Sequence, residues 1–525
     1  MQDSLVEYGA RRVIITITAI LCALLEIVDT TIVNVALNEM KGNLGATLSE
    51  VGWVITAYAI GNVIIVPMTS WLSQQFGRRN YFAASVIIFT VFSFMCGNAT
   101  NIWELVFFRL MQGIGGGALL VTSQTIITES YPIEKRSMAQ AIYGLGVIIG
   151  PTLGPPLGGY IVDNFSWPFI FYINIPIGIV ATLLTLQFVR SPKYADKKSA
   201  SEVDWLGIFL LAITVGSLQY ILERGHEDDW FESKVITTLT LTSFFGFIFF
   251  IWRELTCEHP IVELRVLKNG NLRIGTVMSF ILGFGLYGST FIVPLYTQSV
   301  LGWTALQSGA LMIPAALTTA FMMPIIGRLL TRGVKQQFLV ALGLFIFFIY
   351  SFWGYKILTP DTGKDAFFWM LIMRGAGLGL LFIPITSLSL STLKGPQIGQ
   401  GAAFTGMMRQ LGGSFGVAAI TTFISNKSMF YRSDLVSKLD SNSMMVQQRL
   451  ATLKASFIAK GMTPDQALSA AYKVLDFSVS KQSAVLSYMD VFLYLGLMFL
   501  FCIPFILFVK EKKGGEIIDL SEAMH

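Results

Sequence analysis

The chain has 525 residues, of which 54% are hydrophobic and 13% are charged, and its formal net charge is +5. Soluble globular domains carry about 25% charged residues, so this composition excludes a disordered or collagen-like chain and argues against a soluble enzyme. The small net charge and the dispersed basic residues also argue against nucleic-acid binding. The composition therefore predicts an all-α integral membrane protein with many spans.

Fourteen apolar segments are long enough to be membrane helices, because a helix needs roughly 20 apolar residues to cross the hydrocarbon core. The predicted spans are 13–37, 51–73, 80–97, 103–127, 137–161, 168–189, 205–222, 235–252, 273–298, 305–327, 337–354, 366–390, 400–424 and 484–509. The first span is too long for the apolar part of a cleavable signal, and we expect it to be retained.

Lys and Arg outside the spans gather in alternate connecting segments. Positive charge marks the cytoplasmic side of membrane proteins, so we expect both termini in the cytoplasm. The long loop 425–483 then lies on the outer side. Within it, residues 444–460 predict a helix that ends at Gly461, and Thr463-Pro464 predicts the start of a second helix of about 16 residues.

Two glycine-rich segments predict an internal repeat. Residues 112–117 in the fourth span and 374–379 in the twelfth have similar patterns. Parallel repeats of six helices would produce this spacing. We expect an N-terminal six-helix bundle at 1–190, a linker with two inserted helices at 191–270 and a C-terminal six-helix bundle at 271–525, which includes the long loop.

Charged residues inside membrane spans are costly and indicate functional sites. Glu26 and Asp29 lie in the first span, and their spacing places both on one helix face. A buried pair of carboxyl groups can take up and release a proton near neutral pH, which is the chemistry that proton coupling needs. A structural ion pair with an arginine of a neighbouring helix is the alternative.

Three arginines lie inside predicted spans, and Arg109 in the fourth span is a candidate counter-charge for Asp29. Arg374 and Arg409 need polar partners or water, and we expect them to act in substrate binding, in gating or as contacts between helices. The candidate residues of a substrate cavity are Asn34, Gln112, Gln124, Arg374 and Arg409.

The fifth span contains the dense glycine and proline run GPTLGPPLGG at 150–159. Proline removes backbone hydrogen bonds and kinks a helix, and glycine lets a neighbouring helix approach closely. This run therefore predicts a moving helix interface formed by Gly150, Pro151, Gly154, Pro155, Gly158 and Gly159. A second candidate conformational motif follows the second span at Gly77, Arg78 and Arg79.

Four segments resemble the fourteen-helix drug:proton antiporters, the EmrB/QacA branch of the major facilitator superfamily. They are LEIVDTTIVNVAL at 25–37, LVFFRLMQGIG at 105–115, the run at 150–159 and WPFIFYINIPIG at 167–178. The resemblance covers essentially the whole chain. It implies a major-facilitator fold and alternating access to a site between the two halves, with Asp29 as the proton carrier and Arg109 as the residue that tunes it.

The resemblance also implies an exporter in the bacterial inner membrane that uses the proton motive force and no cofactor. Gram-negative members similar to EmrB work with an EmrA-like periplasmic adaptor and an outer-membrane channel, which the long outer loop fits. The chain departs from the family pattern after the second span, where Ser70, Gln74 and Gln75 replace the usual Gly, Asp and Arg. We therefore expect no salt-bridge latch of the usual kind there.

The function expected from these observations is proton-coupled export of amphipathic drugs and related toxic compounds. A dedicated exporter of one metabolite, such as a fatty acid, a siderophore or an amino acid, is the first alternative. A membrane receptor or scaffold is the second, and it predicts that neutralising Asp29 changes nothing. An intramembrane enzyme that uses Glu26 and Asp29 as acid and base is the third, and it lacks a supporting motif.

Overall fold

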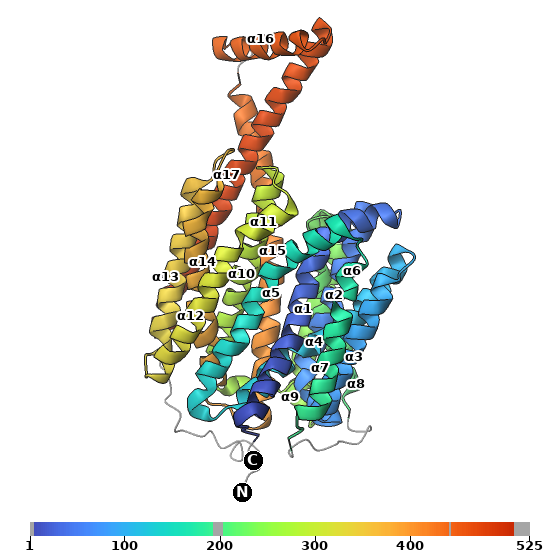
Figure 1. The fold of residues 1–525 in the computed structure, drawn as a ribbon, viewed down its shortest axis with the longest axis vertical. Coiled ribbons are helices and arrows are strands. Elements are labelled where there is room, and N and C mark those ends of the chain that lie inside the picture. Colours follow the sequence, from blue (N-terminus) through green and yellow to red (C-terminus); the bar gives the residue numbers. More distant parts are fainter. Residues whose placement is uncertain (1–4, 193–202, 440–442, 509–525) are drawn as a thin grey trace.

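The computed structural model describes residues 5–192, 203–439 and 443–508, and these ranges contain helices and no strand (Figure 1). Twelve helices in them are long and apolar enough to cross a membrane. Two further long helices, α5 (Arg136–Asn164) and α15 (Pro396–Ser437), pack along α1 (Gly9–Asn43) and α10 (Gly270–Ser299). The predicted all-α membrane fold is confirmed, and the arrangement is consistent with fourteen spans.

The first helix group surrounds α1. It consists of α1, α2 (Leu48–Phe76), α3 (Arg78–Gly97), α4 (Ile102–Ser130), the short η1 (Ile133–Lys135), α5, α6 (Phe169–Tyr172) and α7 (Asn174–Phe188). The predicted sixth span is divided between α6 and α7. Pro176 explains the break, because its ring displaces the carbonyl four residues earlier, that of Tyr172.

The second helix group surrounds α14. It consists of α10, α11 (Ala305–Leu311), α12 (Ile313–Thr331), α13 (Gln336–Ile357), α14 (Lys364–Leu390), α15, α16 (Met444–Ala459) and α17 (Pro464–Phe508). The predicted tenth span is divided into α11 and α12. Pro314 lies in the first turn of α12, where its missing N–H leaves no bond unsatisfied.

Glycines pack equivalent helices together in the two groups. In α4, Gly113 faces the α2 backbone and Gly115 faces the α3 backbone. In α14, Gly375 faces the α12 backbone and Gly377 faces the α13 backbone. Because a side chain at these positions would meet main-chain atoms, the glycines allow close approaches between these helices in each group. This correspondence is what an internal repeat requires, while the predicted domain boundaries stay predictions.

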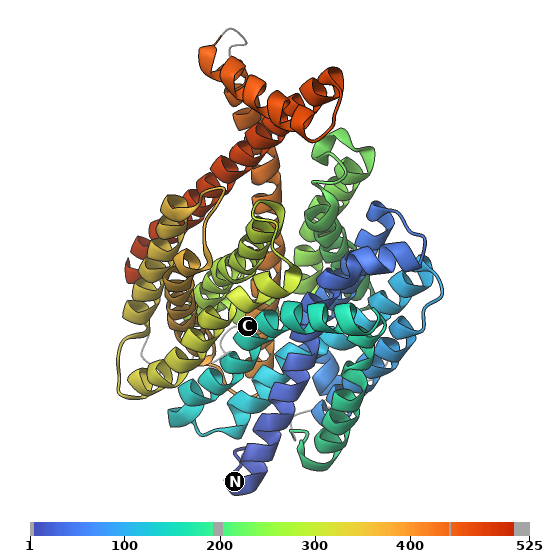
Figure 2. The ribbon, with the colours of Figure 1, turned by 45° about the horizontal axis from the view of Figure 1, so that its top comes forward.

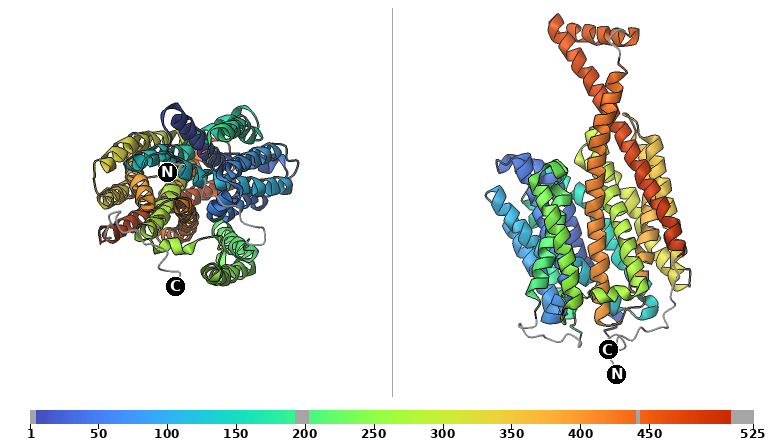
Figure 3. Two further views of the ribbon diagram at one scale, coloured as in Figure 1. Left: turned by 90° about the horizontal axis from the view of Figure 1, so that it is seen from below. Right: turned by 180° about the vertical axis from the view of Figure 1, so that it is seen from behind.

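A helix pair lies between the two groups in sequence and contacts both (Figure 3). It consists of α8 (Trp205–Arg224), η3 (Trp230–Glu232) and α9 (Lys234–Thr256), and η4 (Leu264–Lys268) leads from it to α10. Arg224 of α8 donates to the carbonyl of Ser49 in the first turn of α2 at 3.0 Å. Gln219 of α8 donates to the hydroxyl of Ser414 in α15 at 2.9 Å. Thus α8 bridges the first group to the second.

The helices α15 and α17 extend beyond the bundle, and α16 lies across their projecting ends (Figures 1 and 2). The expected helix after Thr463 begins as predicted, with reciprocal hydrogen bonds between Thr463 and Gln466 of 3.3 and 3.4 Å. Its predicted length is wrong, because α17 continues without a break into the last span. Residues 465–483 contain neither Gly nor Pro, so nothing in them ends the helix.

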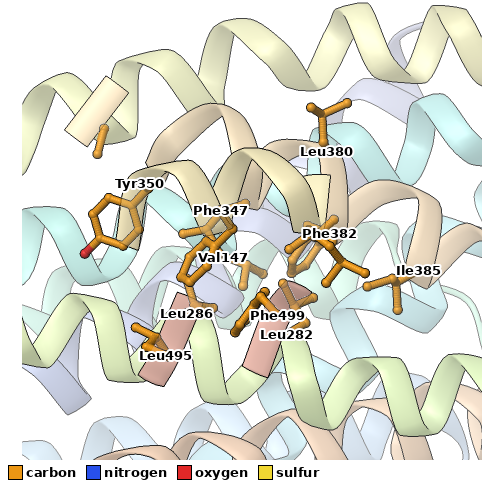
Figure 4. Packing of buried hydrophobic residues seen from close by; sticks show 14 of the residues in the cluster. Val147, Leu282, Leu286, Phe347, Tyr350, Leu380, Phe382, Ile385, Leu495 and Phe499 are labelled. Carbon is orange, nitrogen blue, oxygen red and sulfur yellow. The ribbon is translucent and has the colours of Figure 1, made fainter. Parts of the chain in front are cut away.

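Apolar packing joins the two groups near the middle of the bundle (Figure 4). Val147 of α5 belongs to the same buried cluster as Leu286 and Phe382 of the second group. In this cluster the rings of Phe347 and Phe499 stack with centroids 4.2 Å apart. Close packing of this kind holds membrane helices together through dispersion, because lipid tails are as apolar as the side chains.

Candidate functional site

Two carboxyl groups on α1 lie inside the first helix group. Glu26 and Asp29 are 4% and 0% exposed and stand one helical turn apart. The helices α2, α4 and α7 pack against α1 and supply the groups that bond to these carboxylates. The one-turn spacing places the two side chains in different surroundings, so they can have different chemical roles.

Asp29 is enclosed by hydrogen-bond donors. Its Oδ2 lies 2.5 Å from Nη1 of Arg109, so the contact predicted between these residues is present. Its Oδ1 accepts from the amides of Gln112 at 3.0 Å and Asn174 at 2.9 Å. The same two amides donate to the hydroxyl of Ser93, at 2.6 and 3.1 Å. Two helices besides α1, namely α4 and α7, therefore donate hydrogen bonds to Asp29, and Ser93 of α3 holds two of the donors in place.

Arg109 makes several contacts besides its ion pair with Asp29. Its Nε donates to the carbonyl of Val54 at 3.2 Å, and its Nη1 also donates to Gln112 at 2.7 Å. The guanidinium lies 4.1 Å from the centroid of the Tyr58 ring. Arg109 is only 1% exposed, so the loss of Asp29 would leave a buried cation without its counter-charge.

Glu26 has neutral donors instead of a cation. Its Oε1 accepts from the side-chain amide of Asn62 at 2.8 Å, and its Oε2 accepts from the backbone N–H of Leu120 at 3.2 Å. Among the described residues, none forms an ion pair with Glu26. A carboxyl group with such hydrogen-bond partners can exchange its proton without breaking a hydrogen-bonded ion pair. This property separates Glu26 from Asp29.

The two buried arginines of the second group also have different surroundings. Arg374 of α14 donates to the hydroxyl of Ser289 at 2.8 Å and to the hydroxyl of Thr290. Arg409 of α15 is 3% exposed, and its Nη1 has no hydrogen-bond partner. Its guanidinium lies 5.2 Å from the ring of Phe382, and it interacts electrostatically with Glu26 across the boundary between the groups.

The structure does not bring two of the predicted cavity residues into this network. Asn34 is exposed and bonds weakly to the carbonyl of Thr30 in its own helix, at 3.5 Å. Gln124 is buried between α4 and α5, where it donates to Gln140 at 3.2 Å. Whether either residue meets a substrate in another conformation stays a prediction.

The glycine and proline run of α5 faces two helices. Side chains at three of its glycines, Gly150, Gly154 and Gly158, would meet α1. Its other end meets the second group, where Gly159 lies near Leu306 of α11 and Pro156 lies against Gly309 of α11. Pro151, Pro155 and Pro156 all lie within the helix. The run thus sits where the groups would move against each other, and its role in that movement stays a prediction.

The segment after α2 carries a buried ion pair within the first group. Gly77 has φ of 79°, a conformation that favours glycine, and it separates α2 from α3. Arg78 and Glu129, at the end of α4, form a bidentate ion pair. Nη1 of Arg78 donates to Oε2 of Glu129 at 2.5 Å, and Nη2 donates to Oε1 at 3.1 Å. Arg79 is exposed. In place of the usual family acid, Gln74 bonds to Ser70 at 3.4 Å.

Sequence reasoning missed the residues that complete the two carboxylate environments. Asn62, Tyr58 and Ser93 lie on α2 and α3, and Asn174 opens α7. A polar amide in an apolar span was the available signal for Asn62 and Asn174, because such groups need partners in the membrane. That signal marks the residues but does not say which carboxylate each one meets.

Two helix groups that bury ionisable residues in and between them have the construction of a secondary transporter. The model of the Major Facilitator Superfamily matches residues 19–417. The chain belongs to this superfamily and, within it, to the EmrB type of multi-pass membrane transporter, since the multidrug export protein EmrB of Escherichia coli K12 is 32% identical over 98% of both chains.

Other relatives agree with this assignment. The fatty acid resistance protein FarB of Neisseria gonorrhoeae is 31% identical over 97% of this chain and 98% of its own. Among solved structures, the proton:xylose symporter XylE matches with a TM-score of 0.59 and 16% identity over 98% of this chain and 99% of XylE. The likeness to XylE concerns the fold alone.

Proposed function

We propose that the protein is a proton-coupled multidrug exporter that moves amphipathic toxic compounds out of the cell by alternating access. Family membership supports export, and the relatives named EmrB support drugs as substrates. The observation that carries proton coupling is Glu26, a fully buried carboxyl group held only by neutral donors beside the boundary of the two helix groups. The protein then lies in the inner membrane with both termini in the cytoplasm.

In this proposal the two carboxyl groups have different roles. Glu26 binds the proton from the outer side and releases it to the cytoplasm. Asp29 stays ionised, because its protonation would remove the counter-charge of Arg109. The pair Asp29–Arg109 then keeps α1 and α4 in register while Glu26 changes its charge.

The proton motive force is sufficient and no cofactor is needed. A proton moving through about 150 mV releases about 3.5 kcal/mol. Since 1.4 kcal/mol corresponds to a factor of ten, this sustains an outward substrate gradient of about 300-fold. The run of glycines and prolines in α5 is the proposed sliding surface between the groups during this exchange.

The projecting ends of α15 and α17, with α16, form a surface suited to a periplasmic adaptor. Met444, Met445 and Phe477 are 82%, 79% and 69% exposed. Exposed apolar side chains outside the bilayer are typical of protein contact sites. An EmrA-like adaptor that leads to an outer-membrane channel is the proposed partner.

A dedicated exporter of one metabolite is the second candidate. The relative named a fatty acid resistance protein favours a fatty acid as that metabolite. Both candidates use the same proton site, and they differ in the range of compounds that elicit proton movement.

The test uses inside-out membrane vesicles that are energised and loaded with a pH-sensitive dye, with a panel of unrelated lipophilic compounds. We expect several compounds to release protons from native vesicles and none to do so with Glu26→Gln. Glu50→Gln is the matched control, since it removes a carboxylate at the start of α2 and keeps the cap of that helix. Release by one compound only supports the dedicated exporter. A native response in Glu26→Gln refutes the assignment of the proton to Glu26.

A further inference from the structure

Arg409 is a buried cation that lacks a fixed anionic partner. Of the three arginines inside the predicted spans, Arg109 pairs with Asp29, and Arg374 donates to hydroxyl and carbonyl oxygens. Arg409 forms no ion pair with any described residue, and its Nη1 is without an acceptor. A guanidinium in this position is costly unless a negative charge compensates it.

The groups that face Arg409 come from both helix groups. From the second group they are Phe382 of α14 and Tyr287 of α10. From the first they are Tyr143 of α5 and Glu26 of α1. Direct contacts lead from Phe382 to Glu26. The ring of Phe382 lies 6.3 Å from the ring of Tyr143, the hydroxyl of Tyr143 donates to the carbonyl of Leu120 at 3.1 Å, and the N–H of Leu120 donates to Glu26 at 3.2 Å. A charge on Glu26 therefore attracts Arg409 across the boundary between the two groups.

The remaining ionisable neighbours of Glu26 do not take the place of Arg409. Asp29 lies one turn away on the same helix and is already neutralised by Arg109. Tyr58 of α2 carries no charge at neutral pH and lies against Arg109. Arg409 alone is a cation from the other helix group that faces Glu26 within the described part of the chain. The attraction across the boundary is therefore governed by the protonation of one residue.

We infer that Arg409 acts as a substitute counter-charge for ionised Glu26 when neither a proton nor a substrate is bound, and thereby prevents the empty transporter from changing access. This inference rests on the proposed function. A proton on Glu26 removes the attraction, and a substrate with a cationic group replaces Arg409 as the partner of Glu26. Either ligand frees the groups to move, and the two compete for one carboxylate, which is what exchange of proton for substrate requires.

The inference gives Arg409 a positioning role. A lipophilic monovalent cation is the test ligand, because its charge can replace Arg409 as the partner of Glu26. Arg409 acts through Glu26 and keeps the transporter from running without cargo. Loss of Arg409 should then open a proton leak that depends on Glu26 and needs no substrate.

The test uses purified protein in liposomes that contain a pH-sensitive dye, with an imposed pH gradient and with ethidium as the lipophilic cation. Native protein should show little proton flux without ethidium and a clear flux with it. Arg409→Gln should raise the flux without ethidium by about 5- to 150-fold, the usual range of such coupling. Arg409→Lys keeps the positive charge, so its proton flux without ethidium should stay as low as that of the native protein.

Two further variants separate this inference from a structural defect. Arg224→Gln removes a buried arginine of α8, which pairs with Glu227, and should not leak. Glu26→Gln combined with Arg409→Gln should abolish the leak, whereas a leak through damaged packing would persist. If Arg409→Gln does not give monodisperse protein, Arg409→Met replaces it in the same comparison.

Three results would overturn the inference. They are an Arg409→Gln protein without a leak, an equal leak in Arg224→Gln, or a leak that remains in the double variant. Failure of the proposed function looks different. In that case the native protein shows no ethidium-driven or drug-driven proton flux, although the liposomes hold their gradient.

Discussion

Neutralising Asp29 should act mainly on the stability of the protein, because its carboxylate compensates a buried guanidinium. In Asp29→Asn the amide keeps the shape and one acceptor, but Arg109 stays charged at 1% exposure. Removing one partner of a buried ion pair costs about 3–5 kcal/mol. For a unit of about 190 residues this corresponds to a lowering of the melting temperature by roughly 6–20 °C. The measurement is thermal unfolding in one detergent, followed by intrinsic tryptophan fluorescence.

The double variant Asp29→Asn with Arg109→Gln decides the cause. Neutral partners of similar shape can replace a buried ion pair with little loss of stability, so the double variant should melt above the single one. Glu26→Gln is the comparison, and it should cost only about 1 kcal/mol, since its two neutral donors lose at most one good acceptor. The reasoning is refuted if Asp29→Asn melts like the native protein, or if the second substitution fails to restore it. Asp29 would then be the better candidate for the proton.

Three other outcomes follow from the packing. Gly113→Leu should abolish monodisperse protein, because the new side chain meets the α2 backbone. Gly216→Ala in α8 should be tolerated, because the nearest atoms to the new Cβ are 3.6 and 3.7 Å away. Size-exclusion chromatography distinguishes the two variants. Gly309→Leu should slow substrate-driven proton flux, because Pro156 leaves no room for the side chain when the groups meet; a native rate would exclude this contact from the cycle. A flexible linker in place of 444–459 should leave vesicle transport intact and remove drug resistance in cells; full resistance would exclude the proposed adaptor surface.

The helices α15, α16 and α17 show which features of a helix local sequence and hydropathy predict and which they do not. Helix formation at 444–459 and the cap at Thr463 are confirmed, because they depend on neighbouring residues in the chain. The lengths of α15 and α17 were underestimated, because hydropathy detects only the segment that lies in lipid. A helix that leaves the membrane continues until a residue or a contact ends it.

The glycine patterns also predict that close helix contacts exist without identifying the helices that make them. The similarity of 112–117 and 374–379 predicts a repeat, and the corresponding glycines approach corresponding helices. The run in α5 predicts a close interface, but only the structure divides it between α1 and α11. A glycine allows a close approach without naming the helix that makes it.

The sequence by itself determined the membrane class, the spans, the family resemblance and the ionisable residues inside the bundle. These properties follow from the interaction of each segment with lipid and water, which is local. The pairing of Arg109 with Asp29 is a prediction from the sequence that the structure confirms. The structure is needed to see that Asn62 and a backbone N–H hold Glu26, and that Arg409 packs on Phe382 at the boundary of the helix groups. Those pairings join residues far apart in the chain, and they depend on how the helices rotate and pack, which no single segment specifies.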